Sequence, residues 1–280
     1  MRASSTDGVE LEVHDLGGDG PDLLLVHATG FHGRVWEPLA GHLDGFHRWS
    51  VDMRAHGDST TPEDRALEWD AFADDVLAVV DALGLESPYG VGHSKGGAAL
   101  LLAEERRPGT FRALYCYEPV VMPPELATGR NPDNPLSQGA RRRRDTFDSH
   151  QDAIDNYASK PPFASLHDDA LRAYVEHGFA VADDGTVTLK CRPEMEAEVY
   201  AHGSAHQAFR HLSLVTCPVT IAVGDEAGVP AALGRPVVAA LPDGHLASLP
   251  RLGHFGPLED PAAVAASVLA AFGGDPAALS

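Results

Sequence analysis

Basic residues are scarce in this sequence, and their scarcity narrows the range of partners. Of 280 residues, 21 are Lys or Arg and 41 are Asp or Glu, so the formal net charge is −20 at pH 7. Such a charge repels phosphate backbones and anionic membranes, so we expect neither a nucleic-acid nor a membrane partner. The one basic run, ARRRRD at residues 140–145, is expected to form an exposed face of a helix.

Cysteines and long apolar runs are scarce as well. The three cysteines, Cys116, Cys191 and Cys217, are odd in number and far apart, so they predict neither a disulfide framework nor a metal site. No histidine pair has a convincing metal spacing, so no metal is expected. The first residues, MRASSTDGVELEV, lack the apolar core of a signal peptide, and no run is long enough to span a bilayer. We therefore expect a soluble cytoplasmic protein.

Short apolar runs alternate with helical patterns, which favours a parallel sheet covered by helices. Residues 8–17 alternate polar and apolar side chains, as in a half-exposed edge strand, whereas residues 21–30 are continuously apolar before a glycine, as in a buried strand. Residues 68–85 have apolar side chains at helical spacing, with Gly84 as the expected end of the helix. The further strands are expected within residues 46–59, 87–94, 111–121, 216–226 and 244–254.

This pattern is interrupted after Pro119. Residues 120–140 are rich in Pro, Asn and Gly, and the following residues to about 212 are polar with helical spacing. The strand and helix pattern then resumes at residue 216. We predict a core domain formed by residues 1–119 and 214–280, with a helical cap inserted over residues 120–213.

One serine lies between glycines at the end of a predicted strand. Ser94 occupies the centre of GHSKG, with Gly92 two residues before it and Gly96 two residues after it. A G-x-S-x-G sequence between a strand and a helix is typical of a nucleophile elbow, a turn so tight that the flanking positions must lack side chains. The serine then projects above the sheet at a helix N-terminus, which stabilises negative charge. We predict that Ser94 is a catalytic nucleophile.

Four motifs in order resemble those of the α/β-hydrolase superfamily. They are LLLVHATGFHGRVWEPLA, VDMRAHGDS, the GHSKG elbow and RLGHFGPLEDP. The resemblance covers nearly the whole chain outside residues 120–213, with one departure at Ala28, where the family usually has glycine. It implies an α/β-hydrolase fold, a mostly parallel sheet with helices on both faces and an inserted helical cap.

A serine hydroxyl needs a positioned base and an acid that orients the base. His254 is the best candidate base, because it follows the last predicted strand; His93 belongs to the elbow, and His27 is expected to be structural. Glu118 ends the strand after the elbow helix, where the related haloalkane dehalogenases carry their acid, and a carboxylate ending an apolar strand needs a partner. Asp225 and Glu226 remain alternative acids.

Two backbone N–H groups, those of Thr29 and Lys95, are expected to form the oxyanion hole. In this superfamily the residue after the nucleophile is usually apolar, so the Lys95 side chain is unusual. It could pair with a substrate carboxylate, add to oxyanion stabilisation, or be the counter-ion of an acid such as Glu118. Alternatively, its ammonium reaches water, as in most lysines. From the first role we expect an anionic or strongly polar substrate.

The serine restricts the chemistry that the resemblance implies. Dehalogenases and epoxide hydrolases need an aspartate nucleophile, because a serine would leave a stable ether in place of an ester that water can open. We therefore predict a hydrolase of a small-molecule carboxylic ester, lactone or thioester (EC 3.1) that needs no cofactor. A C–C bond hydrolase or lyase, or a ligand-binding receptor that retains the triad, remains an alternative. The sequence also leaves a homodimer open.

Overall fold

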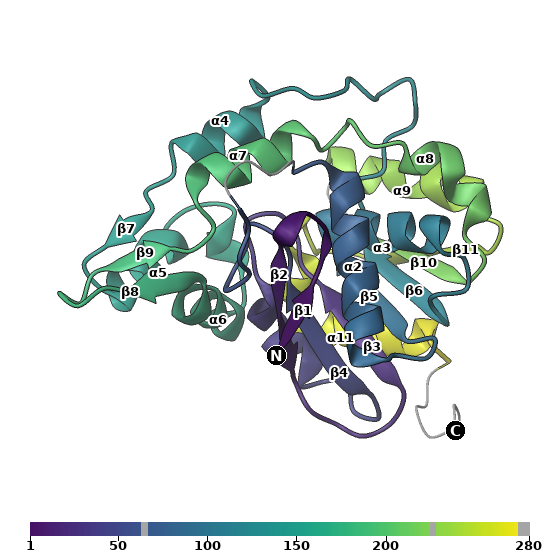
Figure 1. Cartoon of the computed structure of the whole chain (residues 1–280), viewed down its shortest axis with the longest axis horizontal. Coiled ribbons are helices and arrows are strands. Elements are labelled where there is room, and N and C mark those ends of the chain that lie inside the picture. The colour runs from purple at the N-terminus through teal and green to yellow at the C-terminus, as the bar shows by residue number, and fades with distance from the viewer. Residues whose placement is uncertain (63–66, 225–227, 274–280) are drawn as a thin grey trace.

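An eight-stranded sheet forms the centre of the molecule, with strand order β1-β2-β4-β3-β5-β6-β10-β11 (Figure 1). The computed structural model describes residues 1–62, 67–224 and 228–273. The strands are Arg2–Ser4 (β1), Glu10–Asp15 (β2), Asp22–Val26 (β3), His47–Asp52 (β4), Tyr89–His93 (β5), Ala113–Tyr117 (β6), Val219–Gly224 (β10) and Gly244–Leu249 (β11). The pairs β1–β2 and β2–β4 are antiparallel and the others are parallel, so the predicted mostly parallel sheet is confirmed.

Helices cover both faces of this sheet. They are the 3-10 helices η1 (Thr6–Gly8) and η2 (Gly33–Trp36), and the α-helices α1 (Glu37–Ala40), α2 (Trp69–Leu83), α3 (Lys95–Arg106), α9 (Val229–Ala240), α10 (Gly256–Glu259) and α11 (Pro261–Ala271). Alternate residues of β3 enter two separate cores: Leu24 and Val26 join the core that contains α2 and α3, whereas Leu23 and Leu25 join the core that contains α1 and α11. This explains the continuously apolar sequence of β3, which is buried on both sides.

The predicted edge strand needs a correction. Residues Glu10–Asp15 alternate between partly exposed and buried side chains, as expected, but β1 pairs with them from outside and is the actual edge. A strand of three residues has too short an alternation to be recognised in a sequence.

Between β6 and β10 the chain forms helices and a second sheet. The helices are α4 (Pro135–Arg141), α5 (His150–Ala158), η3 (Phe163–Ser165), α6 (Asp168–Gly178), α7 (Pro193–Ala201), α8 (Ala208–His211) and η4 (Leu212–Leu214). The second sheet has three antiparallel strands in the order β7-β9-β8: Thr146–Phe147, Val187–Leu189 and Phe179–Val181. The sequence predicts only helices here, because strands of two or three residues carry almost no periodicity.

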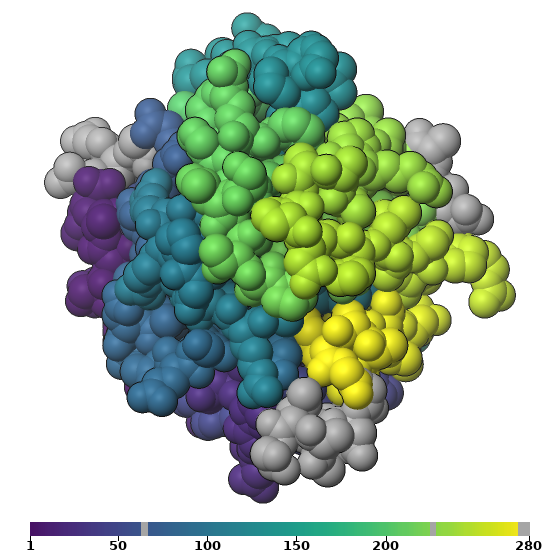
Figure 2. Space-filling model, turned by 90° about the vertical axis from the view of Figure 1, so that its right-hand side faces the viewer, coloured from purple at the N-terminus to yellow at the C-terminus, as the bar shows by residue number. Residues whose placement is uncertain are grey.

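The inserted segment contacts the core at more than one place. Helix α6 packs on η2 and α1, while α8 and η4 pack on α3. Figure 2 shows the second junction, where the green end of the insertion lies between the blue residues of the core and the yellow-green α9. In the part of the chain that the structure describes, no helix is both long and apolar enough to cross a bilayer.

Candidate active site

Ser94 lies in the sharp turn between β5 and α3. Its φ of 54° and ψ of −115° are strained for a residue with a side chain. A Cβ added to Gly96 would lie 2.1 Å from the Val26 carbonyl oxygen, and one added to Gly92 would lie 2.6 Å from the Gly97 nitrogen. The turn therefore needs both glycines, for the steric reason that the sequence suggested.

Three predicted residues from distant parts of the chain meet at this turn. The Ser94 Oγ lies 3.2 Å from Nε2 of His254, and Nδ1 of His254 lies 2.7 Å from Oε2 of Glu118. The other carboxylate oxygen, Oε1, accepts a hydrogen bond of 2.9 Å from the Gly224 N–H. Because Glu118 is only 3% exposed, this carboxylate has the buried partners that a charge at the end of an apolar strand requires.

The two alternative acids, Asp225 and Glu226, lie outside the described residues. Glu118 itself is held by the neighbouring strand, because its backbone N–H donates to the Ala222 carbonyl of β10 at 2.8 Å. Its φ of 42° turns the chain sharply at the end of β6, so that the side chain is directed along the edge of the sheet towards His254.

The loop that carries His254 is fastened to β5 and β6. Nε2 of His93 lies 2.7 Å from the His254 carbonyl oxygen, and the Tyr117 hydroxyl donates to the Gly253 carbonyl at 2.8 Å. His93 thus contacts the backbone of the histidine loop, and the Ser94 hydroxyl has the His254 ring as its partner.

The loop after β3, which carries Thr29, is held by two buried histidines. Nε2 of His27 accepts the Met53 N–H at 3.0 Å, and Nε2 of His56 accepts the Gly30 N–H at 3.1 Å. Each ring therefore carries its proton on Nδ1, which donates to a backbone carbonyl at 2.7 Å. Burial lowers the pKa of both histidines well below 6.5, in agreement with neutral rings. The structural role expected of His27 is confirmed.

Lys95 begins α3, so its N–H has no acceptor within the helix. Its side chain is fully buried, with Nζ 4.2 Å from the centre of the Phe72 ring, and the expectation that the ammonium reaches water is wrong. Among the described residues, Nζ has no hydrogen-bond partner. Burial lowers the pKa of Lys95 to about 7. The ammonium and the Glu118 carboxylate have different neighbours.

The inserted segment brings a second cation to the loop after β3. Nη2 of Arg143 lies 2.9 Å from Oε1 of Glu196, and Nη1 donates to the Tyr174 hydroxyl at 3.1 Å. Oε1 of Glu196 would lie 2.4 Å from a Cβ on Gly30, so the pair covers the residue after Thr29. The expected exposed helix face is therefore wrong for Arg143, which follows the end of α4 and turns inward.

Neither Arg143 nor Glu196 could be identified from the sequence. Arg143 is one of four consecutive arginines, and nothing in the run distinguishes the inward-facing residue. Glu196 lies in the first turn of α7, where a carboxylate is common because it favours the helix dipole.

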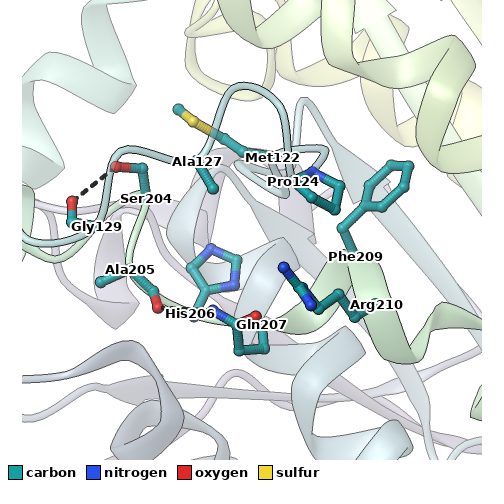
Figure 3. A pocket seen from close by; sticks show the side chains of 10 residues that line it. All are labelled: Met122, Pro124, Ala127, Gly129, Ser204, Ala205, His206, Gln207, Phe209 and Arg210. Atoms are coloured by element: carbon teal, nitrogen blue, oxygen red, sulfur yellow. Dashed lines mark hydrogen bonds between the residues drawn. The ribbon is translucent and has the colours of Figure 1, made fainter.

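A small pocket of about 150 Å³ lies away from these residues, where the two ends of the insertion meet (Figure 3). Residues within 122–129 and 204–210 line it, and the Ser204 hydroxyl donates to the Gly129 carbonyl across it at 3.0 Å. His206 stacks on Trp69 with ring centres 5.1 Å apart and contacts the Val120 carbonyl at 3.0 Å. Ser94 is not among the residues that line this pocket.

Comparison with known proteins identifies the family. A 2-(acetamidomethylene)succinate hydrolase from Mesorhizobium japonicum is 26% identical over 242 residues, which cover 85% of this chain and 83% of the relative. A bifunctional esterase/perhydrolase from Acinetobacter calcoaceticus is 33% identical over 133 residues, 46% of this chain, and the match spans about half of its length (48%). The crystal structure of an E-2-(acetamidomethylene)succinate hydrolase superposes with a TM-score of 0.83 at 24% identity, covering 97% of this chain and 98% of that one. Residues 23–267 match the model of the alpha/beta hydrolase family, and the chain therefore belongs to that family.

Proposed function

We propose that this protein is a serine hydrolase that cleaves a small-molecule carboxylic ester, lactone or thioester. The relay from Ser94 through His254 to Glu118 carries the proposal, because its hydrogen bonds join a nucleophile, a base and an orienting acid in one line. In support, the Acinetobacter relative is named an esterase/perhydrolase.

In the proposed reaction, His254 accepts the Ser94 proton while Oγ attacks the substrate carbonyl carbon. The tetrahedral oxyanion receives hydrogen bonds from the N–H groups of Thr29 and Lys95. His254 then protonates the leaving group, which departs and leaves an acyl-enzyme. Water, deprotonated by His254, attacks the acyl carbon, and Ser94 is released as the acid product forms. Glu118 keeps the proton of neutral His254 on Nδ1 and stabilises the imidazolium.

We further propose that residues 120–213 act as a cap over this site and that residues 1–119 and 214–280 form the catalytic core. Contacts of Arg143, Glu196 and Tyr200 with the loop around Thr29 support a cap, since they bring the inserted segment over the nucleophile's neighbours. The mechanism requires no metal or organic cofactor. All three cysteines are buried and free, which fits a cytoplasmic location.

Labelling with a fluorophosphonate, read by intact mass, tests the proposal. We expect rapid labelling of one site in the wild type, no labelling of Ser94→Ala, and labelling slowed about a thousandfold or more in Glu118→Gln. Ser87→Ala and Glu125→Gln are matched controls on exposed residues. If the wild type is not labelled, Ser94 is not activated and the receptor alternative gains support. If Glu118→Gln labels at the wild-type rate, the acid is Asp225 or Glu226.

A further inference from the structure

Arg143 is placed and oriented like a ligand-binding arginine. Among the described residues it makes one contact to the Glu196 carboxylate and one to the Tyr174 hydroxyl, whereas a guanidinium has five N–H donors. Its side chain is 19% exposed, whereas Glu196 and Tyr174 are fully buried. The buried partners therefore fix the guanidinium plane, and of the three side chains only that of Arg143 retains exposed surface.

Arg143 lies beside the loop that carries Thr29. A Cβ on Gly30 would lie 3.8 Å from Nη1 of Arg143, and Gly30 directly follows Thr29. Aromatic rings cluster next to Gly30: Phe31 contacts Phe163 at 5.8 Å and Phe255 at 5.6 Å between ring centres. Phe255 in turn lies 5.3 Å from the His254 ring. The loop around Thr29 thus has Arg143 on the side of Gly30, and the cluster of Phe31, Phe163 and Phe255 extends from the same loop to the His254 ring.

Arg143, Lys95 and Glu196 all act on the buried Cys191. Burial and the Glu196 carboxylate raise the pKa of its thiol, and the cations Arg143 and Lys95 oppose that rise. Glu196 is the anion that pairs with Arg143. When all three are ionised, Lys95, Arg143 and Glu196 carry two positive charges and one negative charge, and among the described residues Nζ of Lys95 has no hydrogen-bond partner. A single substrate anion would balance these charges.

We infer that Arg143 binds a carboxylate of the substrate beside the oxyanion loop, with the buried charge of Lys95 reinforcing it, so that the preferred substrate is a small ester or thioester bearing a carboxylate. This inference rests on the proposed function of Ser94. A planar guanidinium suits a carboxylate because it can donate two parallel N–H bonds.

Protection of Ser94 against fluorophosphonate tests the inference with two esters of equal size. Monomethyl succinate carries a carboxylate where methyl 4-oxopentanoate carries a methyl ketone. We expect the anionic ester to slow labelling at a concentration about 10- to 100-fold lower than the neutral ester, as for a hydrogen bond to a charged group. This advantage should disappear in Arg143→Gln, shrink in Lys95→Met and persist in Arg142→Gln, a control on the exposed neighbouring arginine.

Glu196→Gln separates ligand binding from a purely structural ion pair. If Arg143 binds the ester carboxylate, Glu196→Gln removes a competing carboxylate and should strengthen protection by the anionic ester. If the ion pair is only structural, Glu196→Gln and Arg143→Gln should both weaken that protection. Equal protection by both esters, no protection by either, an unchanged preference in Arg143→Gln, or equal losses in Arg143→Gln and Glu196→Gln would each overturn the inference.

Two further readouts keep these results interpretable. If Arg143→Gln does not fold, Arg143→Lys retains the charge without the planar fork and should lose most of the preference. The rise in the melting temperature of Ser94→Ala with each ester measures binding without chemistry, and equal rises would also overturn the inference. Absence of wild-type labelling would instead refute the proposed function.

Discussion

Nε2 of His93, the residue before the proposed nucleophile, donates a hydrogen bond of 2.7 Å to the backbone carbonyl of His254. Burial lowers the pKa of His93 well below 6.5, so its ring is neutral and keeps the N–H that this bond needs. The turn that presents Ser94 and the loop that presents His254 are therefore tied by a side chain that does not itself reach the serine hydroxyl. This makes His93 a positioning residue.

Replacing His93 should misplace His254 without removing it. We expect His93→Ala to slow fluorophosphonate labelling by about 10- to 100-fold, because a small displacement of a catalytic group is costly. His93→Gln retains an N–H donor and should recover part of the rate. The exposed His42 offers a control, His42→Ala, that should label at the wild-type rate. If both His93 variants have a lowered melting temperature but label at the wild-type rate, the role of His93 is purely structural.

Gly96, two residues after the proposed nucleophile, should tolerate no side chain. Gly96→Ala places a Cβ 2.1 Å from a backbone oxygen that cannot move aside, so we expect a loss of about 3 kcal/mol or more in unfolding free energy, and of labelling. Gly139→Ala is the matched control, because nothing lies within 4 Å of its added Cβ and it lies within α4. That substitution should stabilise the protein by about 0.5–1 kcal/mol. Chemical denaturation measures both, and an equally stable Gly96→Ala would refute the steric account.

The buried ammonium of Lys95 should make stability depend on alkaline pH. Its pKa falls from 10.5 to about 7 on folding, so between these values the unfolded chain binds the additional proton. The unfolding free energy contributed by this group therefore rises with pH through that window. Lys95→Met should be stabilising by about 2–5 kcal/mol more at pH 6 than at pH 10. Lys160→Met, on the surface, should show no such difference. Urea titrations at both pH values measure these unfolding free energies, and an equal effect of Lys95→Met at pH 6 and pH 10 would contradict the prediction.

Acid should destabilise the fold through neutral buried histidines. Among the described residues they are His27, His32, His56, His93 and His206. Burial lowers the pKa of each, to about 4 for His32, so below pH 6.5 the unfolded chain takes up protons that the folded protein does not. Glu105 and Glu196 oppose this effect, because burial raises the pKa of their carboxyls.

On balance we expect the unfolding free energy to fall by about 1–3 kcal/mol per pH unit between pH 6.5 and 5. Urea unfolding across this range provides the measurement. A constant unfolding free energy would mean that these histidines already carry protons in the folded state.

Much of the fold could be predicted from the sequence because its signals are local. The buried run of β3 and the end of α2 at Gly84, which adopts a φ of 63°, each depend on a few adjacent residues. The elbow is local too, since Gly92 and Gly96 are needed by the turn itself. The sequence does not by itself identify the acid, because the position of Glu118 relative to His254 depends on how β6 lies in the sheet.

The segment between β6 and β10 could not be predicted in the same way. Its strands are too short for periodicity, and the inward turn of Arg143 depends on Glu196, which lies more than fifty positions away in the chain. Lys95 is a different case: its position in the elbow is evident from the sequence, but its burial depends on packing against Phe72, which is distant in the chain. Long-range packing, which one sequence does not encode in a readable pattern, decides these features.

The paired register of β5 and β6 has a consequence for how the site responds to heating. His93 and Tyr117 are direct partners at the ends of these strands, and Ser94 and Glu118 directly follow them, so the pairing of the strands sets their spacing. His254 reaches the site on a loop beyond β11. Ser94 and Glu118 thus keep their places as long as the sheet is folded, whereas His254 leaves the site when its loop unfolds locally. Moderate heating should therefore abolish fluorophosphonate labelling reversibly at a temperature below that of global unfolding. Labelling and circular dichroism recorded against temperature would show two separate transitions, the first in labelling and the second in secondary structure.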